Sequence, residues 1–217
     1  MHSEPPIARA GLTVLLLVPA AVLAALVSAG WAPLRAFDRA VADRLHEVAH
    51  GAPALTTVMT WLTNLFQPNV FRVAAFILVI WLARRGARRT ATWVAVTMIA
   101  GGVLGGLLKL LFGRARPDFL DPVAAAVGYA FPSGHALNSA LAVTIAVLLV
   151  PRWWALWLIP VLTALSRVYL GVHWTSDVIA GLLLGAAVPL LTARAFTRDR
   201  AALTGPVSGG RSRSGLP

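Results

Sequence analysis

The side chains that could take part in catalysis lie mainly in the second half of this 217-residue chain. Asp177 follows His173 by four residues, and in a helix this spacing puts two side chains on one surface. A histidine paired with a carboxylate is held in one tautomer and becomes a better nucleophile. A second histidine, His135, could act as a general acid. The pattern predicts a nucleophile, a carboxylate that orients it and a separate proton donor.

Three cations accompany these groups. Lys109 is the only lysine of the chain, Arg116 follows it seven residues later, and Arg167 comes shortly before the histidine–aspartate pair. If the helix carrying Lys109 continues, this lysine and Arg116 share a face. Together with the Ser133 and Gly134 backbone amides at a helix start, the cations describe an oxyanion site, and arginine forks suit phosphate. The three cations beside the two histidines and the aspartate would repel a divalent ion, so we expect no metal and no other cofactor in this site.

Phosphoryl transfer needs charge neutralised on the phosphate oxygens and two groups roughly in line with the bond that breaks. We expect His173 to attack phosphorus, with Asp177 orienting it. His135 would protonate the departing alkoxide and then activate the water that releases a phosphohistidine. Asp177 could instead pair with Arg167 as an intramembrane carboxylate. We expect Arg114, a further cation, to lie outside the phosphate contacts.

These residues form three strings that resemble the signature motifs of the type-2 phosphatidic acid phosphatase superfamily. The patterns are K-x6-R-P over 109–117, P-S-G-H over 132–135 and S-R-x5-H-x3-D over 166–177. Every signature position matches. The resemblance covers about residues 70–193 and implies a metal-independent phosphatase of six membrane helices that works through a phosphohistidine.

Composition independently indicates a membrane protein. Apolar residues make up 58% of the chain and charged residues 12%, with a mean hydropathy of +0.76. Soluble domains carry about twice that charged fraction. The net charge of +11 arises largely from arginines between apolar blocks and in the tail, so we expect no nucleic-acid partner. The absence of cysteine excludes disulfides and a thiol nucleophile.

The apolar blocks predict an all-α bundle of six transmembrane helices. A signal peptide is the alternative for the first block, with 27–29 as its cleavage site. Between the first two spans, alternating charges and an apolar stripe (Phe37, Val41, Leu45 and Val48) predict an amphipathic helix on the membrane interface. Glycines 101, 102, 105 and 106, and 181 and 185, form small-xxx-small pairs that predict close helix packing. The six predicted spans are 12–32, 70–83, 91–112, 136–150, 153–170 and 175–193.

Arginine placement predicts the orientation of the bundle. Four arginines lie in 84–90 and five in the tail, which places these segments and both termini in the cytoplasm. The motifs then lie on the outer face, as expected for a multi-pass protein of a bacterial inner membrane. We expect one membrane domain over 1–197 and a disordered basic tail over 198–217. Whether copies of the chain associate as a homo-oligomer stays open.

A lipid phosphate in the outer leaflet is the expected substrate. Undecaprenyl pyrophosphate is favoured, with phosphatidic acid and phosphatidylglycerol phosphate as alternatives. Haloperoxidases share the motifs by resemblance but are soluble. A phosphotransferase that passes the phosphoryl group to an alcohol would have the same residues. A non-hydrolytic lipid transporter is the remaining alternative, although transporters place their polar groups near the bilayer midplane.

Overall fold

The computed structural model describes residues 6–203, and its side chains over 10–196. All regular secondary structure in this range is helical, which confirms the all-α prediction. The elements are α1 Pro6–Ser28, α2 Ala32–Gly51, α3 Pro53–Leu65, α4 Pro68–Arg84, α5 Arg88–Phe112, α6 Gly134–Leu149, the 3-10 segment η1 Pro151–Trp157, α7 Leu158–Tyr169 and α8 Thr175–Leu203. α8 thus continues past the predicted domain boundary, and residues 204–217 of the predicted tail lie outside the described range.

Four stretches of the described chain are long and apolar enough to cross a membrane, namely Ala10–Ser28, Pro53–Arg84, Arg88–Phe112 and Thr175–Phe196. α6 is apolar but shorter. Large apolar side chains on the outer faces are exposed, such as Leu15 at 69% and Leu111 at 77%. Surfaces of this kind suit lipid rather than water. The chain is a multi-pass membrane protein, while the count of six spans stays a prediction.

The bundle is built around α6, which is buried over most of its length. α8 packs directly against it because α8 carries glycine where the two backbones meet. A Cβ at Gly181 would lie 2.7 Å from the Ser133 carbonyl oxygen, and one at Gly185 would collide with the Leu137 carbonyl. The predicted close packing is confirmed for this pair. It sets the start of α8 against the start of α6.

The α5 glycines divide between two faces. A Cβ at Gly105 would lie 3.3 Å from Leu137, and one at Gly101 would collide with Leu141, so this pair packs on α6 as predicted. A Cβ at Gly102 or Gly106 would meet no described atom within 4 Å. Close packing within the chain therefore does not explain the second pair.

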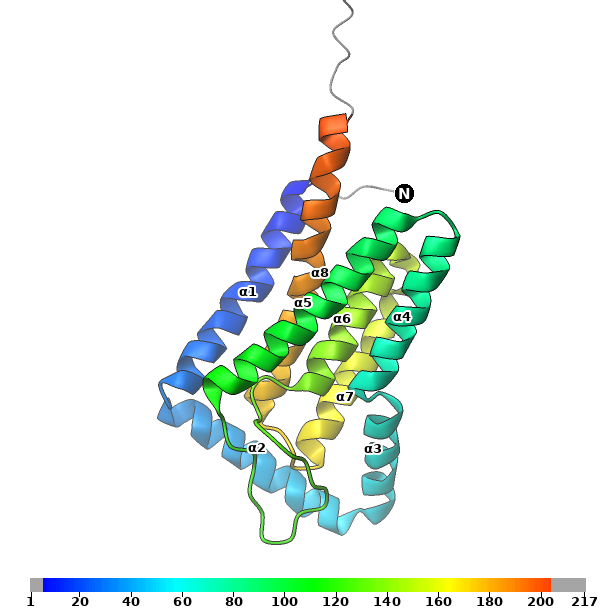
Figure 1. Ribbon diagram of the computed structural model, residues 1–217. Coiled ribbons are helices and arrows are strands. Elements are labelled where there is room, and N and C mark those ends of the chain that lie inside the picture. The colour runs from blue at the N-terminus through cyan, green and yellow to red at the C-terminus, as the bar shows by residue number, and fades with distance from the viewer. Residues whose placement is uncertain (1–5, 204–217) are drawn as a thin grey trace, which may run out of the picture.

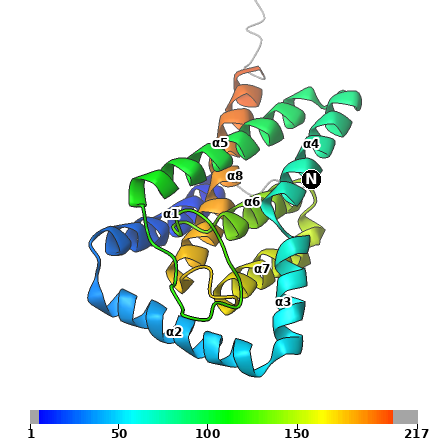
Figure 2. The same cartoon turned by 60° about the horizontal axis from the view of Figure 1, so that its bottom comes forward.

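The predicted amphipathic helix is present as α2, but its inward face is rotated from the expected stripe. Its buried residues are Asp38, Ala42 and Ala49, whereas Phe37 is 52% exposed and Val48 37%. Figures 1 and 2 show α2 running across one end of the bundle, beside the loop from α5 to α6. This helix closes the end of the bundle at which the site is formed.

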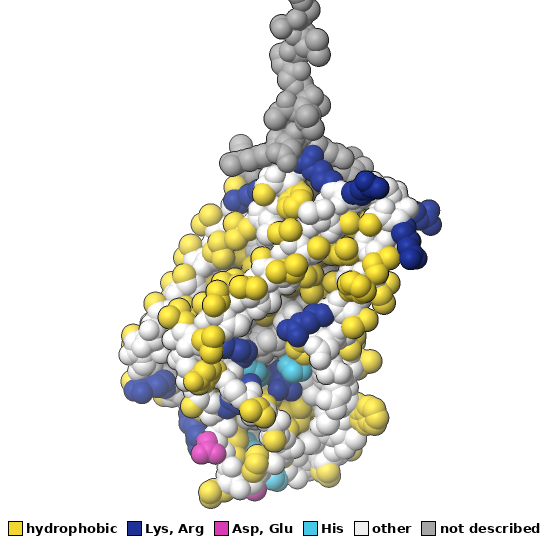
Figure 3. Space-filling model, viewed as in Figure 1, with side chains coloured by type: hydrophobic (Ala, Val, Ile, Leu, Met, Phe, Trp, Pro, Cys, Tyr) yellow, Lys and Arg dark blue, Asp and Glu magenta, His cyan; other side chains and the backbone are white. Residues whose placement is uncertain are grey.

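The two ends of the molecule differ in chemistry. The connection from α4 to α5 and the C-terminal part of α8 lie at one end, and α2, α3 and the α5–α6 loop lie at the other (Figure 1). In Figure 3, Lys and Arg side chains gather at the first end, apolar side chains cover the flank, and basic and histidine side chains meet again farther down. The cytoplasmic placement of the arginine-rich end stays a prediction.

Candidate active site

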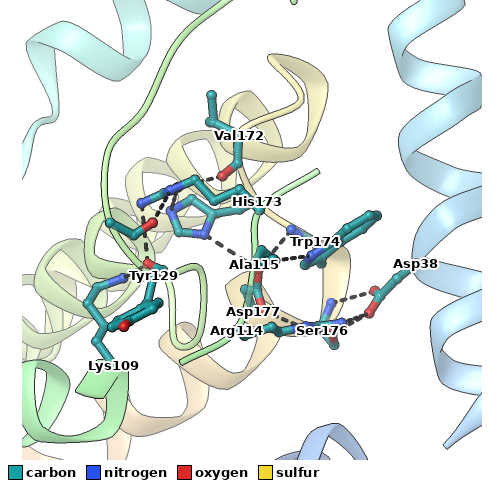
Figure 4. A network of polar contacts seen from close by, with 12 residues as sticks. Asp38, Lys109, Arg114, Ala115, Tyr129, Val172, His173, Trp174, Ser176 and Asp177 are labelled. Carbon is teal, nitrogen blue, oxygen red and sulfur yellow. Dashed lines mark hydrogen bonds and ion pairs between the residues drawn. The ribbon is translucent and has the colours of Figure 1, made fainter. Parts of the chain in front are cut away.

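His173 lies in the short turn between α7 and α8 and is 2% exposed. Its Nε2 lies 3.1 Å from Nη1 of Arg116. A guanidinium can only donate, so Nε2 accepts and the ring proton lies on Nδ1. Nδ1 lies 3.5 Å from Oδ2 of Asp177, an ion-pair distance, and has no hydrogen-bond partner among the described residues. The arrangement leaves the basic nitrogen of the ring pointing at the cations (Figure 4).

Burial lowers the pKa of His173 well below its usual 6.5, and the positive charges of Arg116, Arg167 and Lys109 lower it further. Both effects disfavour the protonated ring. His173 is therefore neutral at physiological pH, which is the form that can attack phosphorus.

Arg116 and Lys109 meet at one carbonyl oxygen. α5 ends at Phe112, where Gly113 takes a left-handed conformation, so the helix does not continue to Arg116 and the two residues do not share a helix face. The loop that follows returns to bring them together instead, because Lys109 Nζ donates to the Tyr129 carbonyl at 2.6 Å. Arg116 donates to the carbonyl oxygens of Gly128 (2.8 Å), Val172 (2.5 Å), Val127 (3.1 Å) and Tyr129 (3.3 Å).

Arg167 approaches the site from α7 and is only 8% exposed. Its Nη1 donates to Oγ1 of Thr63 in α3 at 3.0 Å, and its Nε is buried without a hydrogen-bond partner among the described residues. Its hydrogen bond goes to Thr63, and the ion pairs of Asp177 in the described structure run to Arg114 and His173. The alternative in which Asp177 pairs with Arg167 is therefore not what the structure contains.

Ser133 and Gly134 begin α6 next to the start of α8. The Ser133 amide donates to the Asp177 carbonyl oxygen at 3.0 Å, so this amide is already engaged. What Ser133 can offer a ligand is its buried hydroxyl, which has no hydrogen-bond partner within the described structure. Gly134, the first residue of α6, contributes its amide at a helix N-terminus.

His135 is half-buried in the first turn of α6. Its ring lies within electrostatic reach of the other predicted site residues, namely Lys109, Arg116, Arg167 and His173. The eight residues predicted from the three motifs thus come together at one end of the bundle.

A network of buried charges lies behind His173 (Figure 4). Asp177 is 0% exposed, and its Oδ1 accepts from Nη1 of Arg114 at 2.6 Å while its Oδ2 accepts from the Trp174 amide at 2.9 Å. Nη2 of the same arginine donates to Asp38 at 2.7 Å. Asp38 also accepts from the Ser176 amide at 2.9 Å and from its hydroxyl at 2.5 Å. Arg114 therefore holds two buried carboxylates, one of which lies 3.5 Å from the ring of His173.

Asp38 is not among the site residues that the sequence predicts, and Arg114 is predicted only to lie outside the phosphate contacts. A signal for Asp38 exists, because it precedes Val41 by three residues and Leu45 by seven and so shares their face of the helix. An acid on an apolar face must find a buried partner. No comparable signal identifies that partner, because Arg114 lies 76 residues away.

Comparison with known proteins gives a consistent result. Residues 90–201 match the model of the PAP2 superfamily. An undecaprenyl-diphosphatase of Sulfolobus acidocaldarius is 32% identical over 145 residues, which cover 64% of this chain and 69% of that protein. A lipid A 1-phosphatase of Rhizobium johnstonii is 32% identical over 180 residues, covering 69% and 72% respectively.

A solved structure has the same fold. The crystal structure of a transmembrane PAP2-type phosphatidylglycerolphosphate phosphatase from Bacillus subtilis superposes with a TM-score of 0.73 at 28% identity, covering 86% of this chain and 96% of that one. The family model, the relatives and the fold agree with the motifs that the structure gathers at one end of the bundle. The chain belongs to the PAP2 superfamily and is a membrane phosphatase of lipid phosphates.

Proposed function

We propose that this protein hydrolyses a lipid phosphate at the outer leaflet through a phosphohistidine on Nε2 of His173. The observation that carries the proposal is the ring's environment, with Arg116 on Nε2 and Asp177 facing Nδ1. A phosphate oxygen that takes over the Arg116 donor leaves the Nε2 lone pair directed at phosphorus. Cations at the oxygens then stabilise the charge of the transition state.

The reaction has two displacements. In the first, the Nε2–P bond forms and the P–O bond to the leaving group breaks. His135, which the bound phosphate anion helps to hold in its protonated form, gives that proton to the departing oxygen. In the second, His135 takes a proton from water, the hydroxide oxygen bonds to phosphorus, and the Nε2–P bond breaks. Lys109, Arg116 and Arg167 hold the phosphate oxygens in both steps, with the Ser133 hydroxyl and Gly134 amide as further donors. The chemistry requires no metal.

Undecaprenyl pyrophosphate is the substrate we favour. The relatives named as undecaprenyl-diphosphatases, from Sulfolobus acidocaldarius and Bacillus subtilis, support this choice. The lipid A 1-phosphatase and the phosphatidylglycerolphosphate phosphatase among the similar proteins make other lipid phosphates the alternatives.

The test is phosphate release by the purified full-length protein from a panel of lipid phosphates in the presence of EDTA. His173→Ala should lower the rate by at least about 10⁴-fold, as expected for loss of a nucleophile. Its melting curve should match that of the wild type, which separates a chemical loss from misfolding. Full activity of this variant would refute the mechanism. Addition of a short alcohol distinguishes hydrolysis from transfer, since a transferase would yield the alkyl phosphate.

The outward orientation has its own test, because the chain contains no cysteine. Leu120→Cys, at a fully exposed position of the α5–α6 loop, should react with a membrane-impermeant maleimide in intact cells. Arg85→Cys, at the other end of the bundle, should react only after the cells are lysed. The reverse pattern would place the site in the cytoplasm.

A further inference from the structure

A second cluster of ligating side chains lies outside the candidate active site. His46 and His50 are one turn apart on α2, and with Glu47 they complete the string H-E-x-x-H over 46–50. On a helix this spacing aims two imidazoles at one point, the arrangement used by zinc sites. Asp121 reaches the same point from the α5–α6 loop, and ligand atoms of these three residues lie within 4.8 Å of one another.

The distances from the two histidines to Asp121 are close to those of a coordination shell. Nε2 of His46 lies 3.0 Å from Oδ1 of Asp121, and Nε2 of His50 lies 3.3 Å from its Oδ2. Zinc binds imidazole nitrogen at about 2.0–2.1 Å and carboxylate oxygen at about 2.0–2.2 Å in tetrahedral sites, so two ligand atoms should lie about 3.3 Å apart. A metal ion could therefore replace the hydrogen bonds with little movement of the ligands.

The cluster is also held in place by its surroundings. The His46 ring stacks on Phe119 at a centroid distance of 3.9 Å, with the planes 8° apart. Its side chain is only 13% exposed. His50 additionally contacts the main-chain carbonyl of Asp121 at 3.1 Å. A pre-positioned pair of imidazoles with one carboxylate is a donor set that Zn²⁺ prefers over Mg²⁺ or Ca²⁺.

We propose that His46, His50 and Asp121 bind a zinc ion that ties α2 to the α5–α6 loop. On binding, Nε2 of each histidine becomes the ligand atom and the ring proton resides on Nδ1. Three protein ligands leave a fourth position to water. Glu47 occupies the position that supplies the general base in H-E-x-x-H metalloproteases. Here it is exposed and paired with Arg44 at 2.8 Å, so the role of the ion is structural. The metal acts on the loop whose carbonyl oxygens at 127–129 hold Arg116.

Zinc binding by the full-length protein in detergent tests the proposal. The protein should be purified with a tag that contains no histidine. Bound metal is removed with EDTA, and the EDTA is then removed by dialysis. Titration with ZnCl₂ should give one ion per chain and raise the melting temperature. Co²⁺ at the same site should give the intense visible absorption of tetrahedral coordination. Since loss of even a residue that only supports a ligand costs about 10–100-fold in affinity, His46→Ala, His50→Ala and Asp121→Asn should each weaken binding at least tenfold.

Asp118→Asn is the matched control, because it removes a neighbouring exposed loop acid and should bind zinc as the wild type does. His50→Ala should fold normally because this side chain is 44% exposed, so weaker zinc binding in this variant reports on the site and not on misfolding. The absence of saturable binding, or equal affinity in the wild type and His50→Ala, would overturn the proposal. In either case the cluster only joins α2 to the α5–α6 loop by hydrogen bonds. Phosphate release in EDTA is measured separately, so failure of the zinc site does not count against the proposed hydrolysis.

Discussion

The two sides of His173 are built in opposite ways. On the carboxylate side, Asp177 and Asp38 are almost fully buried and share Arg114, with contacts of 2.6 and 2.7 Å. On the cationic side, Lys109 and Arg116 hydrogen-bond to carbonyl oxygens of a loop, and Arg167 to one threonine hydroxyl. One side pairs its charges, whereas the other gathers like charges with neutral acceptors.

This difference indicates on which side the groups can exchange their present hydrogen-bond partners for a substrate phosphate. Neutral carbonyl and hydroxyl oxygens bind a cation more weakly than an anion does, so a phosphate can take over these donors. A buried ion pair, in contrast, is expensive to break because each partner would be left uncompensated. In the proposed mechanism, the carboxylate side therefore holds the ring of His173 and the cationic side binds the substrate phosphate.

Arg114→Ala should have the largest effect on stability. It leaves Asp38 and Asp177 buried without their cation, and breaking a buried pair in this way costs about 3–5 kcal/mol. We expect a large drop in melting temperature together with loss of phosphate release. Adding Asp38→Asn should restore part of the stability by removing one orphaned charge. If Arg114→Ala alone melts like the wild type, the carboxylate side is not rigid.

Arg167→Gln should show the reverse, a large loss of rate with little change in stability. Arg167 is buried with no acid partner in the described structure, so its removal also removes a desolvation cost. Loss of one donor to a transition-state oxygen lowers kcat by about 10²–10³-fold. Arg72→Gln, an exposed arginine of α4, should keep normal kinetics. A strongly lowered melting temperature in Arg167→Gln would show that this arginine holds the fold.

Inorganic phosphate, the reaction product, should stabilise the wild type against heat. At a concentration about 100 times Kd, binding adds about 2.7 kcal/mol to the free energy of unfolding. The gain should shrink in Lys109→Gln, because this cation donates to a phosphate oxygen in the proposed complex, and should persist in Arg72→Gln. Melting curves with and without phosphate give the comparison. An equal shift in all three proteins would place the bound phosphate elsewhere.

The pH dependence should show the smallest effect. The pKa of His173 is lowered, so the ring protonates only below pH 6.5 and the acid limb of kcat/KM lies below that value. Arg116→Gln removes one of the charges that lower this pKa and should move the limb to higher pH. The ionisation of the substrate phosphate is the same for both proteins and cannot produce this difference. Identical limbs would mean that another group controls the profile.

Much of this arrangement follows from local sequence, and the remainder depends on contacts between distant segments. The apolar blocks predict most of the helices, although the block at 153–170 begins as the 3-10 segment η1 and only then continues as α7. Fixed spacing within each motif identifies His135, His173 and Asp177. The meeting of Lys109 with Arg116 required the α5–α6 loop to return to Tyr129, which no periodicity encodes. The contact from Asp38 to Ser176 spans 138 residues and likewise could not be foreseen.

The placement of Asp38 on α2 should make the turnover rate depend on the lipid bilayer. The same helix carries Phe37, whose side chain is 52% exposed, and on the predicted membrane interface lipid headgroups and chain ends would surround it. Any shift of the helix caused by bilayer thickness or headgroup charge would pull on Asp38, then on Arg114, and so on the carboxylate behind the nucleophile. Turnover in reconstituted vesicles should therefore vary with the host lipid even when the substrate is held constant.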